Sequence, residues 1–302
     1  MIFTKSIVND GSILFLRIFL QTMIVYLNGE FLPLAEAKIP VLDRGFIFGD
    51  GIYEVIPVYD GQLFRIQEHL QRLENSLAKI QLINPYTRAD WLRFMNVLIE
   101  RNGGGSQTIY LQVTRGVEKR QHHFPDSVTP TVLMTSSPFS APVKVTQGYT
   151  AITRPDIRWL RCDIKSTALL GNVLLRQEAI ANDAKETILI RDGYLTEGAA
   201  TNVFIVIKGV VMTPPKTNFI LHGITRDVLI EFLQRAGIPC QETPVSESQL
   251  RTADEIWLTS TSLEVAPVTR LDNKPVGSGQ VGAVWSHAWD VFQTFKQQAL
   301  NQ

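Results

Sequence analysis

The chain has 302 residues, of which 45% are hydrophobic and 19% charged, and Lys plus Arg equal Asp plus Glu at 29 each. Its length exceeds that of a usual single domain, so two domains are expected. The balanced charge gives no support to binding of nucleic acid or an acidic membrane surface. The two cysteines, Cys162 and Cys240, are too few for a disulfide framework and lack metal-ligand spacing, which favours a reducing cytoplasm.

The first 22 residues are predicted to be an extension without a role in the fold. Residues 13–19 are apolar except for Arg17, so the segment loosely resembles a signal peptide. Arg17 interrupts the apolar stretch, no small-residue cleavage site follows, and the stretch is too short for a transmembrane helix. A strand-like pattern begins at Met23, a candidate start of translation. A signal or membrane anchor is the alternative.

Residues 23–140 predict a small α+β domain. Asn28-Gly29 is typical of a hairpin turn, and Asp60-Gly61 ends an alternating strand. Thr87 and Asp90 have the spacing of a capping box at the start of a helix. The expected elements are a hairpin over 26–31, strands over 51–60 and 62–64, helices over 66–80 and 87–101, and strands over 108–114 and 131–135. The proline-containing segment 138–146 is the expected linker.

Residues 147–302 predict a larger α+β domain. Gly237 followed by Pro239 is typical of the end of a helix that begins near Gly223. The expected elements are a strand over 149–153, a helix over 169–182, a meander of strands over 187–190, 203–207 and 210–213, the helix from 223, a strand over 255–260, a hairpin over 265–276, and a C-terminal helix.

Lys165 and Glu197 have the residue types of one particular cofactor chemistry. A lysine amine forms a Schiff base with an aldehyde, and a carboxylate pairs with a protonated ring nitrogen, as pyridoxal phosphate (PLP) requires. Either residue alone is more often an ordinary surface charge. Ile224 and Thr225 add a possible anion site, because the first N–H groups of a helix are unpaired and Gly223 permits a tight entry.

From about Met23 to the C-terminal helix, the chain resembles the class IV (fold-type IV) PLP aminotransferases, and among them the D-amino acid aminotransferases. The resemblance implies a two-domain α+β fold with the cofactor at the domain interface. Seven stretches carry it in the same order: 43–55, 68–73, 112–116, 156–166, 196–198, 223–227 and 259–261.

By similarity, Lys165 is the catalytic residue that carries the cofactor, and Glu197 pairs with the pyridine nitrogen. The other implied cofactor contacts are Arg72, Ile224, Thr225, Ser260 and Thr261 at the phosphate and Leu221 at the ring. The resemblance assigns the substrate carboxylate to Tyr53, Arg120 and His122, a set of donors whose charge and geometry suit a carboxylate.

In this family the arginine and histidine come from the neighbouring subunit, so the resemblance implies a homodimer. No metal site is expected, because His122 and His123 lack a further ligand. Ala199 and Ala200 depart from the family, whose members often carry serines there. Losing these hydroxyls removes possible hydrogen bonds near the cofactor.

The resemblance implies a ping-pong aldimine mechanism in a cytoplasmic enzyme without nucleic-acid or membrane partners. A D-amino acid such as D-alanine gives its amino group to a 2-oxo acid such as 2-oxoglutarate, forming pyruvate and D-glutamate. The alternatives are a branched-chain L-aminotransferase, an aminodeoxychorismate lyase, or a PLP-binding protein without turnover. The pattern Arg120-x-His122 favours the D-amino acid enzymes over each of these.

Overall fold

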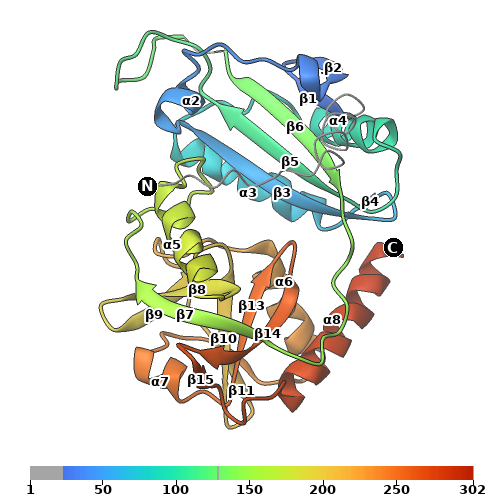
Figure 1. Cartoon of the computed structure of the whole chain (residues 1–302). Helices are drawn as coiled ribbons and strands as arrows, with labels where there is room; N and C mark the ends of the chain where they lie inside the picture. The colour runs from blue at the N-terminus through green and yellow to red at the C-terminus, as the bar shows by residue number, and fades with distance from the viewer. Residues whose placement is uncertain (1–22, 128, 302) are drawn as a thin grey trace, which may run out of the picture.

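The computed structural model describes residues 23–127 and 129–301. The predicted extension over residues 1–22 lies outside the described residues. The chain builds two units that each combine one sheet with helices, joined by the single connection 139–148 (Figure 1). We call residues 23–138 the N-terminal unit and residues 149–301 the C-terminal unit. The mixed α+β class expected from the sequence is confirmed.

The N-terminal unit is an antiparallel six-stranded sheet in the order β2-β1-β6-β5-β3-β4. The expected capping box at Thr87 and Asp90 is present, and the apolar side chains of α3 and α4 pack against the sheet in one core. The elements are β1 (Ile24–Leu27), β2 (Glu30–Pro33), the 3-10 helix η1 (Leu34–Glu36), α2 (Arg44–Phe48), β3 (Gly51–Tyr59), β4 (Gln62–Leu63), α3 (Ile66–Lys79), α4 (Arg88–Arg101), β5 (Gln107–Thr114) and β6 (Thr131–Pro138).

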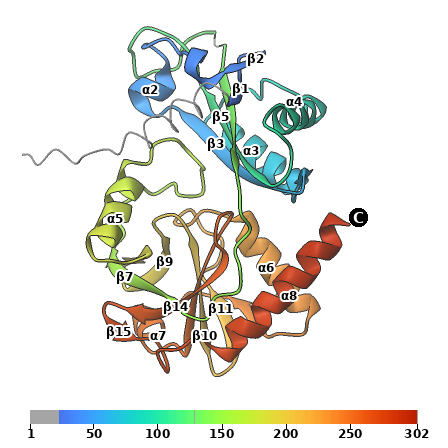
Figure 2. The same cartoon turned by 45° about the vertical axis from the view of Figure 1, so that its right-hand side comes forward.

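The C-terminal unit is a mixed sheet in the order β12-β11-β10-β13-β14-β7-β8-β9, with β15 beside β14. Helices α6 and α8 lie side by side (Figure 2). They pack together through aromatic side chains, among them Phe232, Phe292 and Phe295. The elements are β7 (Tyr149–Pro155), α5 (Leu170–Ala181), β8 (Glu186–Arg191), β9 (Tyr194–Gly198), β10 (Asn202–Ile207), β11 (Val210–Thr213), α6 (Ile224–Arg235), β12 (Cys240–Glu242), α7 (Glu247–Arg251), β13 (Glu255–Ser260), β14 (Glu264–Leu271), β15 (Lys274–Pro275) and α8 (Ala283–Leu300).

The predicted meander is correct only in its second half, where β10 and β11 pair antiparallel. Strand β8 pairs with β7 and β9, whereas β10 pairs with β11 and β13. The prediction missed β9, because this five-residue strand is mostly buried yet includes Thr196 and Glu197, so it lacks the apolar run of a core strand. This correction matters for the site, since β9 is the element that holds Glu197.

Among the described residues, no helix combines the length and the apolar character needed to cross a bilayer.

Candidate active site

Side chains from both units line a cavity of about 640 Å³. Strand β3 and helix α3 contribute to one wall, and the 156–169 segment, β9, the start of α6 and the loop after β13 contribute to the others. Nine of the eleven residues predicted from the sequence line this cavity: Tyr53, Arg72, Lys165, Glu197, Leu221, Ile224, Thr225, Ser260 and Thr261. The fold therefore brings together predicted residues that lie up to 208 positions apart in the sequence, from Tyr53 to Thr261.

Lys165 lies on the segment that joins β7 to α5, half-buried at the cavity wall. Its backbone carbonyl accepts a hydrogen bond of 2.9 Å from the Tyr53 amide, and Ser166 forms a bridge with Ile52. These contacts attach the lysine segment to β3 of the other unit. The Lys165 Nζ lies 4.0 Å from the centroid of the Tyr53 ring, so the amine is placed beside the phenol inside the cavity.

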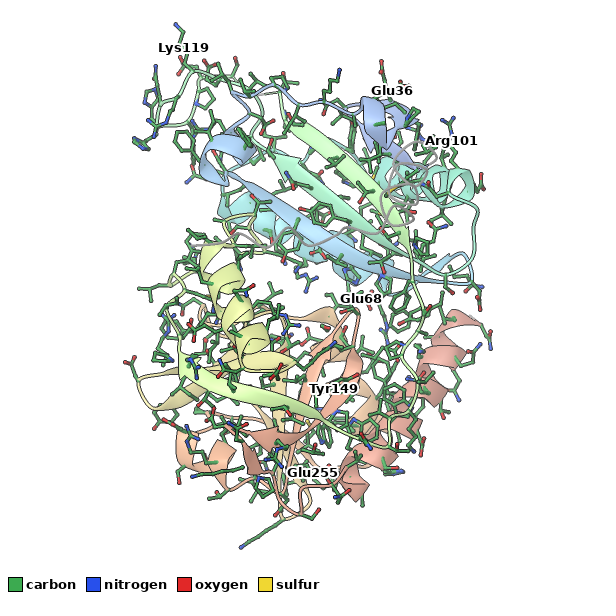
Figure 3. All side chains as sticks on the ribbon, viewed as in Figure 1. Glu36, Glu68, Arg101, Lys119, Tyr149 and Glu255 are labelled. Atoms are coloured by element: carbon green, nitrogen blue, oxygen red, sulfur yellow. The ribbon has the colours of Figure 1, made fainter. Side chains whose placement is uncertain are left out.

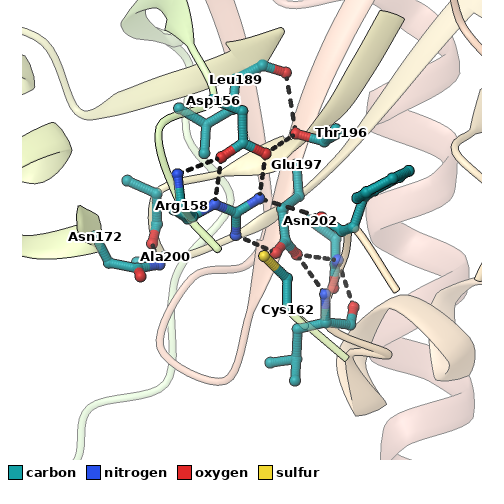
Figure 4. A network of polar contacts seen from close by, with 12 residues as sticks. Asp156, Arg158, Cys162, Asn172, Leu189, Thr196, Glu197, Ala200 and Asn202 are labelled. Atoms are coloured by element: carbon teal, nitrogen blue, oxygen red, sulfur yellow. Dashed lines mark hydrogen bonds and ion pairs between the residues drawn. The ribbon is translucent and has the colours of Figure 1, made fainter. Parts of the chain in front are cut away.

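Glu197 is buried on β9 within a polar network (Figure 4). One carboxylate oxygen accepts from Arg158, and the other accepts from Asn202 Nδ2 at 3.0 Å and from the Leu221 amide at 2.9 Å. Burial raises the pKa of Glu197 to about 7, against the lowering effect of the Arg158 charge. A protonated ring nitrogen beside Glu197 would favour the ionised carboxylate, because an opposite charge nearby stabilises the charged form.

Arg158 and Asn202 were not identified from the sequence. Arg158 is itself fixed by Asp156, whose two oxygens accept from the guanidinium at 2.9 Å each. The only available signal was that Arg158 falls within the matched stretch 156–166. A pair of buried charges 39 positions apart becomes visible only when the fold brings the two segments together.

Arg72 projects from α3 with part of its guanidinium already occupied. Glu54 accepts two hydrogen bonds of 2.7 Å from Arg72, and the His222 carbonyl accepts a third at 3.1 Å. A guanidinium has five N–H donors, so two remain for an anion in the cavity. Burial alone would raise the pKa of Glu54, but Arg72 and a hydrogen bond with His69 outweigh it and lower that pKa to about 2.

The start of α6 leaves its first amide groups without a side-chain cap. Gly223 occupies the N-cap position and makes no side-chain hydrogen bond, so the N–H groups of Ile224 and Thr225 are available to an anion. Gly223 is required here because an added Cβ would lie 2.0 Å from the Asn202 Oδ1. The glycine thus lets the helix begin directly against the residue that orients Glu197.

The last residue of β13, Ser260, and the loop after it complete this end of the cavity. The Thr261 hydroxyl donates to the Val55 carbonyl at 3.3 Å, and the Leu263 amide donates to the Ser260 hydroxyl at 3.2 Å. The neighbouring Thr259 hydroxyl also lines the cavity and is buried without a hydrogen-bond partner among the described residues. Together with Arg72 and the start of α6, these groups fit the phosphate of a phosphorylated cofactor, and the Glu197 carboxylate could pair with a protonated ring nitrogen.

Arg120 and His122 do not line the cavity of their own chain. They are exposed on the segment between β5 and β6, where both side chains lie near Phe48, and Lys119 marks the outer edge of this segment (Figure 3). Arg44 donates to the carbonyls of Gln121 and His122 and so attaches the segment to α2. The described chain therefore leaves two of the eleven predicted residues apart from the other nine.

Comparison with known proteins shows to which family this chain belongs. The model of the family "Amino-transferase class IV" matches residues 51–271, which is more than half of the chain. The chain belongs to the class IV aminotransferases. This class IV aminotransferase is 42% identical over 275 residues to D-alanine aminotransferase of Staphylococcus epidermidis, covering 90% of the chain and 98% of the relative. It is 40% identical to D-alanine aminotransferase of Bacillus licheniformis, covering 90% of the chain and 96% of the relative.

Solved structures support the same family and fold. The branched-chain amino acid aminotransferase of Escherichia coli aligns with a TM-score of 0.83 and 28% identity, covering 90% of this class IV aminotransferase and 93% of that chain. A second branched-chain amino acid aminotransferase, complexed with N-(5'-phosphopyridoxyl)-L-glutamate, aligns with a TM-score of 0.85 and 27% identity over 93% and 96% of the two chains. Class IV aminotransferases use pyridoxal phosphate, in agreement with the expected cofactor.

Proposed function

We propose that this class IV aminotransferase transfers the amino group of a D-amino acid of the D-alanine type to a 2-oxo acid such as 2-oxoglutarate, giving pyruvate and D-glutamate. The observation that carries the proposal is the 40–42% identity to D-alanine aminotransferases over 90% of the chain. The branched-chain enzymes described above share the fold at 27–28% identity. Their similarity therefore supports the branched-chain alternative less well.

The cofactor site follows from the donors of the cavity. When bound, pyridoxal phosphate supplies a reactive aldehyde carbon and an electron-accepting ring. In the proposal Lys165 Nζ would hold the cofactor through its aldehyde carbon. Once released, the same amine would move a proton from the substrate α-carbon to that cofactor carbon. Glu197 holds a proton on the ring nitrogen, and Leu221 packs against the ring. The phosphate is bound by Arg72, Ile224, Thr225, Ser260 and Thr261.

Substrate binding in the proposal needs a second copy of the chain. Tyr53 lines the cavity, and Arg120 and His122 of the partner subunit bind the substrate carboxylate. The exposed apolar side chains around α2 and α5 support a dimer, because a monomer rarely exposes many large apolar groups on one side. Figures 1 and 2 both show α2 and α5 on the same side of the molecule. These side chains include Phe46, Trp159, Leu160, Leu170, Val173 and Leu174.

The proposal also includes the domain division 23–140 and 147–302 and a cytoplasmic location. The two sheets and the single connection between them support the division. The free thiols of Cys162 and Cys240 suit a reducing compartment.

A coupled assay tests the reaction. The purified protein is mixed with D-alanine and 2-oxoglutarate and pyruvate is followed, with L-alanine plus 2-oxoglutarate as the matched control. In a third reaction, L-leucine plus 2-oxoglutarate, formation of L-glutamate is followed. Pyruvate from D-alanine alone is expected. L-Glutamate from L-leucine without pyruvate from D-alanine would favour the branched-chain alternative.

A mixing experiment tests the shared site. Lys165→Ala and Arg120→Met should each be nearly inactive alone. A mixed dimer has one site with an intact Lys165 facing an intact Arg120 of the partner subunit. Random exchange of subunits should therefore restore about a quarter of the parent activity, since half of the dimers are mixed and each has one complete site. No recovery on mixing would mean that Arg120 does not complete the site of the partner subunit.

A further inference from the structure

A group of polar side chains lies buried in the apolar core where the two units meet, outside the cavity lining. Glu264, Lys296 and Tyr59 are 1%, 6% and 7% exposed, and aromatic side chains of the C-terminal core surround them. Charges in such surroundings are expensive to desolvate, and apolar residues of similar volume would stabilise the fold as well or better. The group is therefore better explained by how it positions the segments that it joins than by a contribution to the stability of the fold.

The group connects three elements. The Tyr59 hydroxyl donates to Glu264 Oε1 at 2.6 Å, and Lys296 Nζ donates to the same oxygen at 2.7 Å. Gln293 donates to Glu264 Oε2 at 2.6 Å, so both carboxylate oxygens are held. Tyr59 ends β3 of the N-terminal unit, whereas Glu264 begins β14 and Lys296 lies on α8, which rises toward the N-terminal unit in Figure 1.

Tyr59 and Glu264 each lie on a segment that also lines the cavity. Glu264 directly follows loop 260–263 and has a φ of 51°, a left-handed conformation that a glutamate adopts at a cost. Tyr59 lies on the same strand as Val55, whose carbonyl accepts from Thr261. The loop is thus attached to β3 at two points, by Thr261 inside the cavity and by Glu264 behind it.

The proton of the Tyr59 hydroxyl is firmly held. Burial and the Glu264 charge both raise the pKa of Tyr59 above its ordinary value of 10. The phenol therefore remains a donor throughout the pH range in which a protein is normally assayed.

We propose that Glu264, held by Tyr59 and Lys296, is a positioning residue that fixes loop 260–263 against β3 so that Ser260 and Thr261 meet the cofactor phosphate. The inference rests on the proposed cofactor site. It assigns a role in PLP binding to three residues that do not themselves line the cavity.

The substitution Tyr59→Phe tests the inference, because it removes one hydroxyl and changes little volume. The matched control is Tyr26→Phe, which removes the hydroxyl of another buried tyrosine, one that donates to the Tyr86 hydroxyl at 2.7 Å within the N-terminal unit. The dissociation constant of PLP is measured on the cofactor-depleted full chain by absorbance titration. Tyr59→Phe should raise it about fivefold, the effect of losing one hydrogen bond, and Tyr26→Phe should leave it within twofold of the parent.

A second set of variants tests the charges. Glu264→Gln leaves Lys296 buried without a counter-charge and should raise the PLP dissociation constant further. The double variant Glu264→Gln/Lys296→Met removes both charges while keeping an acceptor for Tyr59, so it should recover affinity toward the parent value.

Three outcomes separate the possibilities. Weaker PLP binding in Tyr59→Phe, with normal binding in the control at a similar melting temperature, supports the inference. Unchanged PLP affinity in both Tyr59→Phe and Glu264→Gln would overturn it and leave the group a structural ion pair. Failure of the parent chain to bind PLP would overturn both the inference and the proposed function.

Discussion

The raised pKa of Glu197 predicts a specific dependence of folding stability on pH in the cofactor-free chain. In the folded state the pKa is about 7, compared with 4.5 for an ordinary glutamate. Between these values the folded chain keeps the Glu197 proton that the unfolded chain has released. Raising the pH therefore favours the unfolded state, and the stabilisation present below pH 4.5 is lost as the pH rises through 7.

The size of the effect follows from the shift. At about 1.4 kcal/mol per pKa unit, the full loss is about 3 kcal/mol, of which about 2 kcal/mol falls between pH 5.5 and 8. The substitution Glu197→Gln removes the titration. The free energy of unfolding of the variant minus that of the parent should therefore rise by about 2 kcal/mol between pH 5.5 and 8.

The assay is urea unfolding of the cofactor-depleted chain followed by tryptophan fluorescence at several pH values. Glu54→Gln is the matched control. The pKa of Glu54 is lowered to about 2, so its contribution is present above about 4.5 and is lost only as the pH falls through 2. Its difference from the parent should stay nearly constant between pH 5.5 and 8. Parallel pH profiles for the parent and Glu197→Gln would refute the reasoning.

Three further predictions concern the same cavity. Arg158→Met leaves Glu197 buried without its cation and should lower the free energy of unfolding by about 3 kcal/mol or more, measured by denaturant titration at pH 8. Gly223→Ala places a Cβ 2.0 Å from Asn202 Oδ1, so it should weaken PLP binding about tenfold in an absorbance titration. Burial raises the pKa of Cys162 to about 11, so iodoacetamide should alkylate this thiol very slowly at pH 8, as followed by mass spectrometry.

Each of these predictions has a result that contradicts it. A loss below about 1 kcal/mol in Arg158→Met would mean that the Glu197 charge does not depend on Arg158. For the glycine, Gly171→Ala is the control, because its added Cβ would meet only ordinary contacts at 3.5 Å or more. Equal PLP affinity in the two alanine variants would remove Gly223 from the site. Complete alkylation of Cys162 within minutes would show an ionised, accessible thiol.

Local signals in the sequence predicted much of the fold. The capping box at Thr87 and the glycine entry at Gly223 depend only on neighbouring residues, and the structure confirms both starting points. Strand β9 was missed although its partner β8 directly precedes it in the chain. Its burial is not visible in its composition, because two of its five residues are Thr196 and Glu197. A short segment that includes Glu197 carries no apolar run to mark it.

The residues of the site also fall into those that the sequence predicted and those that only the fold reveals. Lys165 and Glu197, which line the cavity, were predicted because their residue types suit one chemistry and matched a family pattern. Arg158 and the pair of Glu54 with His69 were not found, since each is significant only through a charge that the fold places beside it. Sequence reasoning identifies groups that face a ligand more readily than the ions that hold those groups in place.

The start of α6 has a consequence for the life of the protein in a cell. Helices α4 and α7 carry their own caps, from Thr87 and Ser246, whereas α6 begins at a glycine without one. In the proposed complex the cofactor phosphate completes this helix, so the chain without cofactor has an unfinished helix end. Amide hydrogen exchange at residues 224–226 would then report cofactor loading. A shortage of the cofactor would shorten the lifetime of the folded enzyme and also lower its activity.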